Sequence, residues 1–427
     1  RDIHDNKPPL LYLLAGVAGK VFYFRLILMV WFGAAVAVFY KLMQVLFPKK
    51  KAAWQLSTLA MIGLTTIFEG NVANAEIFIV LPVILGMLLA FQKARNSKHE
   101  IRNEMWSWFG IGLIFNLGFM LKVPAGLDFG ALMIWLIFFS KFDKKAWLMI
   151  VGFLLPTALS LVYFYFKGGF EPYWRSALMQ NFGYLASWKT GEHSLIIRTG
   201  LLILTLGVFW LTAKKYQLSQ GARLMVVWFL LALFGALLSE RPYPHYLIQP
   251  AVPLAILFSY FLFGKRKLLK MIILIVAAGT GWFYYQFRFW QYPVVAYYQN
   301  FTEMVLGKKS QEEYRNYFDP RVDQNYKVAK YLRAKTLTKD RIFVWGDEPA
   351  IYALANRLPV GRYTVAYHVI DFNGFEETMK AFDAYRPKVV VVVEYEKREF
   401  PELQTRLATD YVLIDKLGQA LIYRRVL

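Results

Sequence analysis

Apolar runs of about membrane-spanning length recur through the first two thirds of this 427-residue chain. A bilayer core about 30 Å thick needs about 20 apolar residues in a helix. Hydrophobic residues make up 57% of the chain and charged residues 19%, whereas ordinary soluble domains have about 45–50% and about 25%. The pattern predicts a polytopic α-helical membrane protein with ten spans, at residues 23–47, 53–69, 74–92, 106–121, 124–139, 146–166, 195–213, 222–239, 247–264 and 270–289.

Basic residues mark the loops on one side of the predicted membrane. If residue 1 lies outside, five short inner loops hold seventeen Lys and Arg, and the outer loops between spans hold few, as the positive-inside rule requires. The net charge of +21 is thus spread over membrane loops. It does not form the single basic patch that would indicate a nucleic-acid partner. The inner loops are residues 48–52, 93–105, 140–145, 214–223 and 265–270.

This topology divides the chain into three regions. Residues 1–22 are expected to form an outer juxtamembrane loop and an interfacial helix, and since a polar motif follows Arg1 directly, we expect a first span and outer loop upstream. Residues 23–289 form the transmembrane bundle. Ten spans that start outside end outside, so residues 290–427 are expected on the periplasmic or extracellular face, as a connector and a soluble domain.

The C-terminal region alternates strand-like and helix-like segments. Residues 341–345 and 388–394 are runs typical of buried strands. Helical patterns lie around them, and the alternation predicts a small α/β domain with a mainly parallel sheet. Asp347 stands where it would cap the next helix. The predicted helices cover residues 323–337, 347–357, 374–385 and 400–408, and the connector covers 290–320.

A lysine beside two prolines is the first candidate for function. In His4-Asp5-Asn6-Lys7-Pro8-Pro9 the prolines keep Lys7 out of a helix interior. The apolar stretch 10–19 is too short to span and suits a helix in the membrane interface. Lys7 would then lie at the outer surface, where its ammonium could bind a lipid phosphate. The alternative is that Lys7 only snorkels, extending its ammonium to the water at the interface, and that the two prolines only start a helix.

Two more ionisable residues stand at the outer ends of predicted spans, where they are costly and so indicate function. Glu76 could act as a general base or cation ligand, and unlike Glu69 it is expected to point into the bundle. The alternative is a first-turn glutamate that stabilises the helix N-terminus. Lys122 lies between two short spans. It either binds a ligand or forms a structural pair with Asp128 or Glu76.

Two outer loops add polar and aromatic side chains. His245 and Tyr246 could donate hydrogen bonds to a phosphate or a sugar, or could pack at the interface. The loop 167–194 suits stacking on sugar rings and an interfacial aromatic belt equally well. All of these features face one compartment, which favours chemistry on a lipid headgroup. A transporter would place its polar groups near the midplane.

Four segments resemble the GT-C superfamily of membrane glycosyltransferases. His4–Leu14 resembles its Lys-Pro-Pro-Leu signature, and Leu117–Pro124 resembles its apolar Lys-Gly-Pro segment with Val123 in place of Gly. Pro244–Pro250 resembles the family's late outer-loop segment, and Ile342–Gly346 resembles the soluble domain of many bacterial members. The branch that fits is the bacterial one similar to protein O-mannosyltransferases and lipid A aminoarabinose transferases.

The resemblance implies a GT-C-like fold in the cell (inner) membrane. It implies that a sugar moves from a polyprenyl-phosphate donor to a lipid, glycan or protein acceptor on the outer face, usually with inversion. Lys7 would bind the carrier phosphate and Lys122 would help to neutralise it. Glu76 would occupy the place of the acidic residue at the head of a later span. His245 and Tyr246 belong to the same donor-binding set.

The family's main catalytic carboxylate lies in an outer loop that would precede Arg1. Asp2 and Asp5 lie in the matching loop and are candidates for contacting donor or acceptor. The chain has no Cys, which excludes Cys-ligated metal sites. No cofactor is expected, although carboxylates without a His cluster could hold a divalent cation loosely. The alternative function is a transporter or flippase for a lipid-linked substrate, without bond cleavage.

Overall fold

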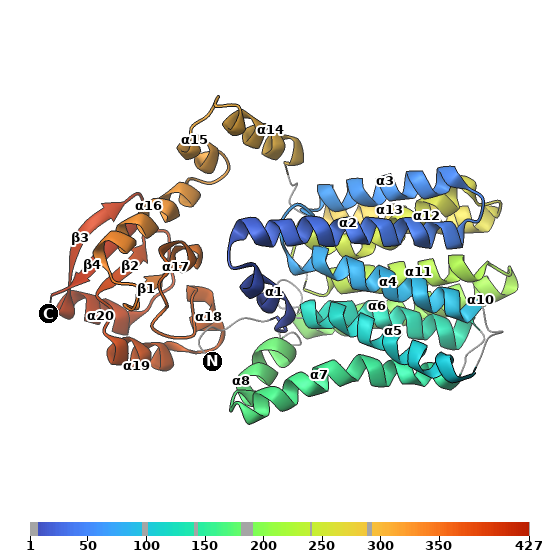
Figure 1. The fold of residues 1–427 in the computed structure, drawn as a ribbon, viewed down its shortest axis with the longest axis horizontal. Coiled ribbons are helices and arrows are strands. Elements are labelled where there is room, and N and C mark those ends of the chain that lie inside the picture. Colours follow the sequence, from blue (N-terminus) through green and yellow to red (C-terminus); the bar gives the residue numbers. More distant parts are fainter. Residues whose placement is uncertain are drawn as a thin grey trace. The chain divides into compact units, whose positions relative to one another are not determined.

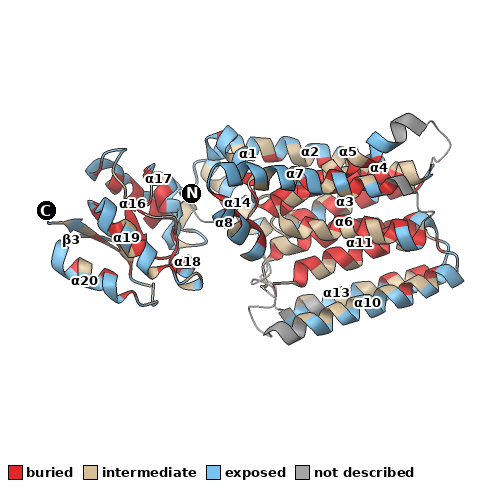
Figure 2. Cartoon of the chain, turned by 90° about the horizontal axis from the view of Figure 1, so that it is seen from below, coloured by how far each residue is buried: buried red, intermediate tan, exposed pale blue. Residues whose placement is uncertain are grey.

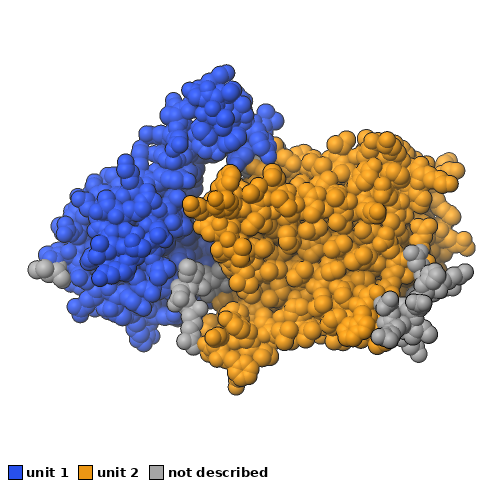
Figure 3. All heavy atoms as spheres, in the orientation of Figure 1, with its two compact units in different colours: residues 1–5, 295–427 blue, residues 6–294 orange. Residues whose placement is uncertain are grey.

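A computed structural model describes residues 7–95, 101–140, 144–180, 191–239, 241–287 and 293–426. The chain forms two compact units, Asn6–Val294 and Val295–Leu427, which have different colours in Figure 3. In the described part of the first unit every regular element is a helix, whereas the second unit combines helices with a sheet (Figure 1).

Seven helices within the described ranges are long and apolar enough to cross a membrane. Three other predicted spans coincide with shorter helices. Two of these are apolar: the Met105–Leu121 part of α5 (Ile101–Leu121), and Val123–Phe139, which comprises α6 (Gly126–Ile134) with its flanking turns η1 (Val123–Ala125) and η2 (Trp135–Phe139). The third is α3 (Lys51–Ile67). The chain is therefore a multi-pass helical membrane protein. The seven long helices are α2 (Val21–Leu46), α4 (Ala75–Arg95), α7 (Leu148–Phe166), α10 (Gly191–Lys215), α11 (Gln220–Leu237), α12 (Ile248–Phe263) with its first turn η5 (Pro244–Leu247), and α13 (Lys267–Phe287).

The centre of the bundle is formed by α4, α11 and α12, whereas α10 and α13 lie at its edge and are largely exposed (Figure 2). Small residues allow close helix contacts, as is common where apolar burial cannot drive association. A side chain at Gly112 of α5 would collide with α7, and one at Gly152 of α7 would collide with α5. Exposed apolar faces of the edge helices suit contact with lipid.

Short helices complete the first unit. α1 (Leu10–Ala18) packs Leu11 into the bundle core and leaves Leu13 and Val17 exposed. It contacts α2 and α5. The remaining short elements are η3 (Lys144–Trp147), α8 (Phe170–Tyr173) and η4 (Trp174–Met179).

The second unit contains a four-stranded sheet in the order β1-β2-β4-β3. β1 (Phe343–Trp345) and β2 (Val389–Val393) are parallel, and β4 (Ala420–Arg425) pairs antiparallel with both β2 and β3 (Tyr411–Leu417). The prediction of a mainly parallel sheet is therefore wrong. β3 and β4 form a hairpin whose turn contains Gly418 at φ 62°, a conformation that glycine adopts at low cost.

Helices cover both faces of this sheet, because successive strand side chains point to opposite sides. Val344 and Val391 pack against α16 (Pro320–Lys335) and α17 (Ala350–Ala355). Phe343 and Trp345 pack against the opposite set of helices. That set is α18 (Ala366–Asp371), α19 (Phe375–Tyr385) and α20 (Pro401–Asp410), and the connector before α16 contains α14 (Val294–Val305) and α15 (Gln311–Asn316).

Candidate functional site

An ion pair at one end of the bundle brings together two of the predicted site residues. Glu76 is the second residue of α4, and Lys122 follows the last residue of α5 in an extended conformation. The Lys122 ammonium donates to Glu76 Oε1. The side chain of Glu76 is 6% exposed and that of Lys122 is 19% exposed. Of the two structural pairs considered for Lys122, the one with Glu76 is present.

His245 and Tyr246 lie against this pair. The Lys122 ammonium is 4.2 Å from the centre of the Tyr246 ring, so a cation–π contact adds to the ion pair. His245 Nε2 is 3.6 Å from Glu76 Oε1. Both residues belong to η5, the turn that starts α12. The sequence therefore identified four residues that the fold brings into one cluster: Glu76, Lys122, His245 and Tyr246.

Glu69 also belongs to this cluster, contrary to the expectation that it points away from the bundle. Its Oε2 is 2.7 Å from His245 Nδ1. An ionised carboxylate only accepts hydrogen bonds, so Nδ1 is the protonated nitrogen in this contact. Glu69 has a positive φ of 64° just after α3. This left-handed turn redirects the chain, and no helical periodicity in the sequence indicates it.

Asp128 is linked by hydrogen bonds to the segments that carry the cluster. Its Oδ1 accepts from Trp228 Nε1 at 2.6 Å, and its Oδ2 accepts from Gln249 Nε2 at 2.7 Å. The same Gln249 nitrogen donates to the carbonyl oxygen of Pro124 at 3.1 Å. Asp128 and Gln249 are both buried. Gln249 therefore connects the turn that follows Lys122 with the first turn of α12.

Lys7 lies in the chain just before α1, and Asp2 and Asp5 lie outside the described residues. Lys7 is partly buried and Pro8 is buried. The start of α2 is fixed next to the cluster, because the Phe24 ring stacks on Phe78 with centres 5.4 Å apart. Phe78 is only two residues after Glu76. The start of α2, which follows the Lys7 segment and α1, therefore lies near the end of the bundle that carries Glu76.

The cluster combines two carboxylates with an ammonium and an imidazole in a place that is only partly open to solvent. Glu76 faces Lys122 and Glu69 faces His245, so each carboxylate has a protein partner. Among the described residues no group of three or more His, Asp or Glu side chains is arranged to hold a metal ion. Such an arrangement can accept a proton at Glu76 and can present a cation to an anionic group.

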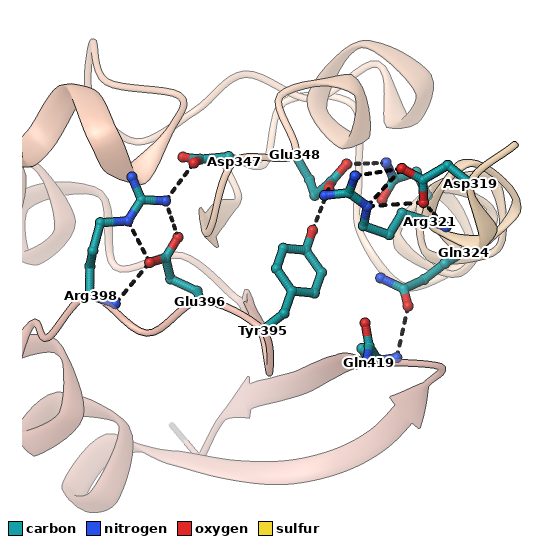
Figure 4. A network of polar contacts seen from close by, with 10 residues as sticks. Asp319, Arg321, Gln324, Asp347, Glu348, Tyr395, Glu396, Arg398 and Gln419 are labelled. Atoms are coloured by element: carbon teal, nitrogen blue, oxygen red, sulfur yellow. Dashed lines mark hydrogen bonds and ion pairs between the residues drawn. The ribbon is translucent and has the colours of Figure 1, made fainter. Parts of the chain in front are cut away.

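A second polar network lies at the carboxyl ends of β1 and β2 in the C-terminal unit (Figure 4). Glu348 accepts from Asn325 and from the hydroxyl of Tyr395. Arg321 donates to Asp319 at 2.9 Å and 2.5 Å. These bonds lower the pKa of the Asp319 carboxyl below its ordinary value. Burial, and then the bond to Glu348, raise the pKa of Tyr395.

Asp347 of this network caps a different helix from the predicted one. Its Oδ1 accepts from the backbone N–H of Tyr367 at 3.2 Å, which satisfies one of the first amides of α18. Its Oδ2 accepts from Arg398 at 2.5 Å. α17 begins after Pro349 without a side-chain cap. The prediction that Asp347 caps α17 is therefore wrong, because the carboxylate turns across the sheet edge toward α18.

No protein-family model and no curated protein matches the chain. Among solved structures, the chain is similar to the archaeal oligosaccharyltransferase AglB from Archaeoglobus fulgidus in complex with an inhibitory peptide and a dolichol-phosphate. The match has 11% identity and a TM-score of 0.48, and it covers 98% of this chain and 68% of that one. The peptide and the dolichol-phosphate are ligands of that protein.

Proposed function

We propose that this chain is an integral membrane glycosyltransferase of the GT-C type. It moves a sugar from a polyprenyl-phosphate donor to a lipid, glycan or protein acceptor. The observation that carries the proposal is the convergence of Glu76, Lys122, His245 and Tyr246. Three separate chain segments supply these four groups, and the start of α2, which follows the Lys7-Pro8-Pro9 segment and α1, packs on Phe78, two residues after Glu76. A largely buried acid–cation cluster at the end of a bundle suits the headgroup of a lipid substrate.

The proposed reaction is a direct displacement at the anomeric carbon. The acceptor hydroxyl attacks, the bond from the sugar to the phosphate oxygen breaks, and polyprenyl phosphate leaves with the bonding electron pair. Lys7 and Lys122 stabilise the negative charge that develops on this phosphate. Glu76 accepts the proton of the attacking hydroxyl, or orients that hydroxyl.

The ion pair of the resting site links donor binding to activation of the base. Lys122 lies between the Glu76 carboxylate and the Tyr246 ring. A phosphate that approaches the ammonium competes with Glu76 for it, and the carboxylate then becomes available to the acceptor. His245, held by Glu69 through Nδ1, keeps its Nε2 toward Glu76 during this exchange.

The distribution of basic residues supports a location of the cluster on the non-cytoplasmic side. Lysine and arginine concentrate in the loops at the opposite ends of the helices. The proposed location is therefore the cell (inner) membrane, with the transfer reaction and the C-terminal unit on the outer face. Membrane lipids surround the bundle, and Asp2 and Asp5 are proposed to contact donor or acceptor.

The test uses the full chain in liposomes with undecaprenyl-phosphate-linked sugars, and it measures released undecaprenyl phosphate. We expect Lys7→Ala and Lys122→Met each to lower turnover by about 100-fold or more, as removal of a charge-stabilising donor typically does. Lys20→Ala and Lys167→Ala are matched controls, because both lysines are exposed. Normal release by the Lys7 and Lys122 variants would refute the proposed roles.

The same liposomes separate the enzyme from the transporter alternative. A flippase moves the labelled lipid across the bilayer and releases no undecaprenyl phosphate. Glu76→Gln is expected to reduce release strongly while the protein remains folded. If Glu76→Gln changes only the thermal stability, its carboxylate serves the helix N-terminus and is not a base.

A further inference from the structure

Helix α14 has an apolar stripe along one side. Val294, Tyr297, Tyr298, Phe301 and Val305 follow the spacing i, i+3, i+4, i+7 and i+11. This spacing places all five on one face of a helix. In a water-soluble domain such a face packs against the core.

In α14 the polar side packs instead. Asn300 is only 2% exposed, and its side chain donates to the carbonyl oxygen of Tyr314 at 3.0 Å. Lys309 donates to Asn300 Oδ1 at 3.2 Å and pairs with Glu303 at 2.7 Å. The chain after α14 therefore folds back over the polar side of the helix.

The apolar side is left exposed. Tyr298 is 45% exposed, Phe301 46% and Val305 61%. Phe318, which is 49% exposed, extends this surface, because its ring stacks on Tyr297 with centres 6.3 Å apart. The arrangement is the reverse of that expected for an element surrounded by water.

The position of α14 in the chain indicates what this side contacts. Its first residue is seven residues after Phe287, the last residue of the membrane-spanning helix α13. Seven residues reach at most about 25 Å. The intervening sequence contains Phe289, Trp290 and Tyr292, and Trp and Tyr are the residues enriched at membrane–water interfaces. The helix therefore starts within reach of the bilayer surface.

We propose that α14 lies on the bilayer surface, with its exposed apolar side in the boundary between headgroups and acyl chains. Amphipathic helices bind membranes in this orientation. Lys308, which is exposed and follows the helix, is placed to meet anionic headgroups.

The absence of Cys from the sequence allows a direct test by single-cysteine labelling of the full chain. Phe301→Cys and Val305→Cys place a bimane fluorophore on the apolar side. Gln299→Cys, at an exposed position on another side of α14, is the matched control. The labelled proteins are placed in nanodiscs of phosphatidylethanolamine and phosphatidylglycerol, with or without doxyl-labelled acyl chains, and iodide serves as the aqueous quencher.

We expect the ratio of doxyl to iodide quenching to be at least threefold higher for labels at 301 and 305 than for the label at 299. Equal ratios at the three positions would overturn the proposal, because the apolar side would then face water. Protection of 301 and 305 from both quenchers would also overturn it, since a protein surface would then cover the helix. All three positions are exposed; Gln299→Cys removes one hydrogen bond to Glu303, and the contacts of Asn300 with Tyr314 and Lys309 remain.

Discussion

A double-mutant cycle on Glu76 and Lys122 tests whether the ion pair organises the site. Lys122→Met leaves a carboxylate that is 6% exposed, on a short side chain at the start of α4, with His245 Nε2 at 3.6 Å as a remaining neighbour. Loss of one partner from a buried pair is strongly destabilising, and we expect a cost of about 3 kcal/mol. The cost is large because the carboxylate cannot easily reach water.

The reverse substitution should cost less. In Glu76→Gln the amide oxygen still accepts from Lys122, and the lysine, already 19% exposed, can extend its ammonium to water. We expect a loss of about 1 kcal/mol, the contribution of a typical hydrogen bond. The double variant has no buried charge at these two positions and should also lose about 1 kcal/mol. The coupling energy is then about 3 kcal/mol.

The free energy of unfolding is measured by titration with SDS in mixed micelles. The exposed pair Arg175–Glu171, at 2.9 Å, provides a control cycle whose coupling should be at most about 0.5 kcal/mol. If the Glu76 and Lys122 costs add to within about 0.5 kcal/mol, the reasoning is refuted. Recovery of stability in the double variant without recovery of sugar transfer would separate the catalytic role from the structural one.

Two further substitutions test the links around the site and in the C-terminal unit. Asp128→Asn places an amide where Trp228 and Gln249 both donate a hydrogen bond, so the side-chain amide of Gln249 must flip and lose its bond to the turn after Lys122. We expect a lower Tm, a stability loss of about 2 kcal/mol and reduced sugar transfer. An unchanged Tm and unchanged transfer would contradict the linking role of Asp128. The Arg321 bonds lower the pKa of Asp319. The ionised Asp319 therefore stabilises the fold at every pH above its ordinary pKa, and this stabilisation is lost as the pH falls through the lowered pKa. Arg321→Gln should therefore reduce the acid-induced loss of hydrogen-exchange protection in α16, and an unchanged pH dependence would exclude this contribution.

Helix positions could be predicted from the sequence because length and hydropathy are local properties. The predicted span 74–92 corresponds to α4, Ala75–Arg95, and the predicted strand 388–394 corresponds to β2, Val389–Val393. The sheet order could not be predicted in the same way. It depends on the pairing of β2 with β4, a contact between distant segments. The strand β3 was missed although Tyr411, Val412 and Ile414 are residues that favour strands.

Site residues could be predicted from the sequence where a charged residue stands among apolar ones. Glu76 and Lys122 stand out for that reason, and the sequence left their pairing as one of two alternatives. Glu69 was missed because its role depends on a single left-handed residue after α3. Gln249 was visible as a polar residue in a span, but its partners come from α6 and η1, which no local pattern connects with α12.

The charge balance of the cluster explains why Lys7 is needed in the proposed reaction. Glu69 and Glu76 are two carboxylates, and within the cluster they face one ammonium, that of Lys122, and the imidazole of His245. Both carboxylates therefore compete with a phosphate for the cations of the site. A second ammonium, proposed to come from Lys7, would add positive charge for the phosphate. Lys7→Ala should therefore weaken donor binding as well as turnover, and a raised KM for the donor at the same kcat would limit Lys7 to binding.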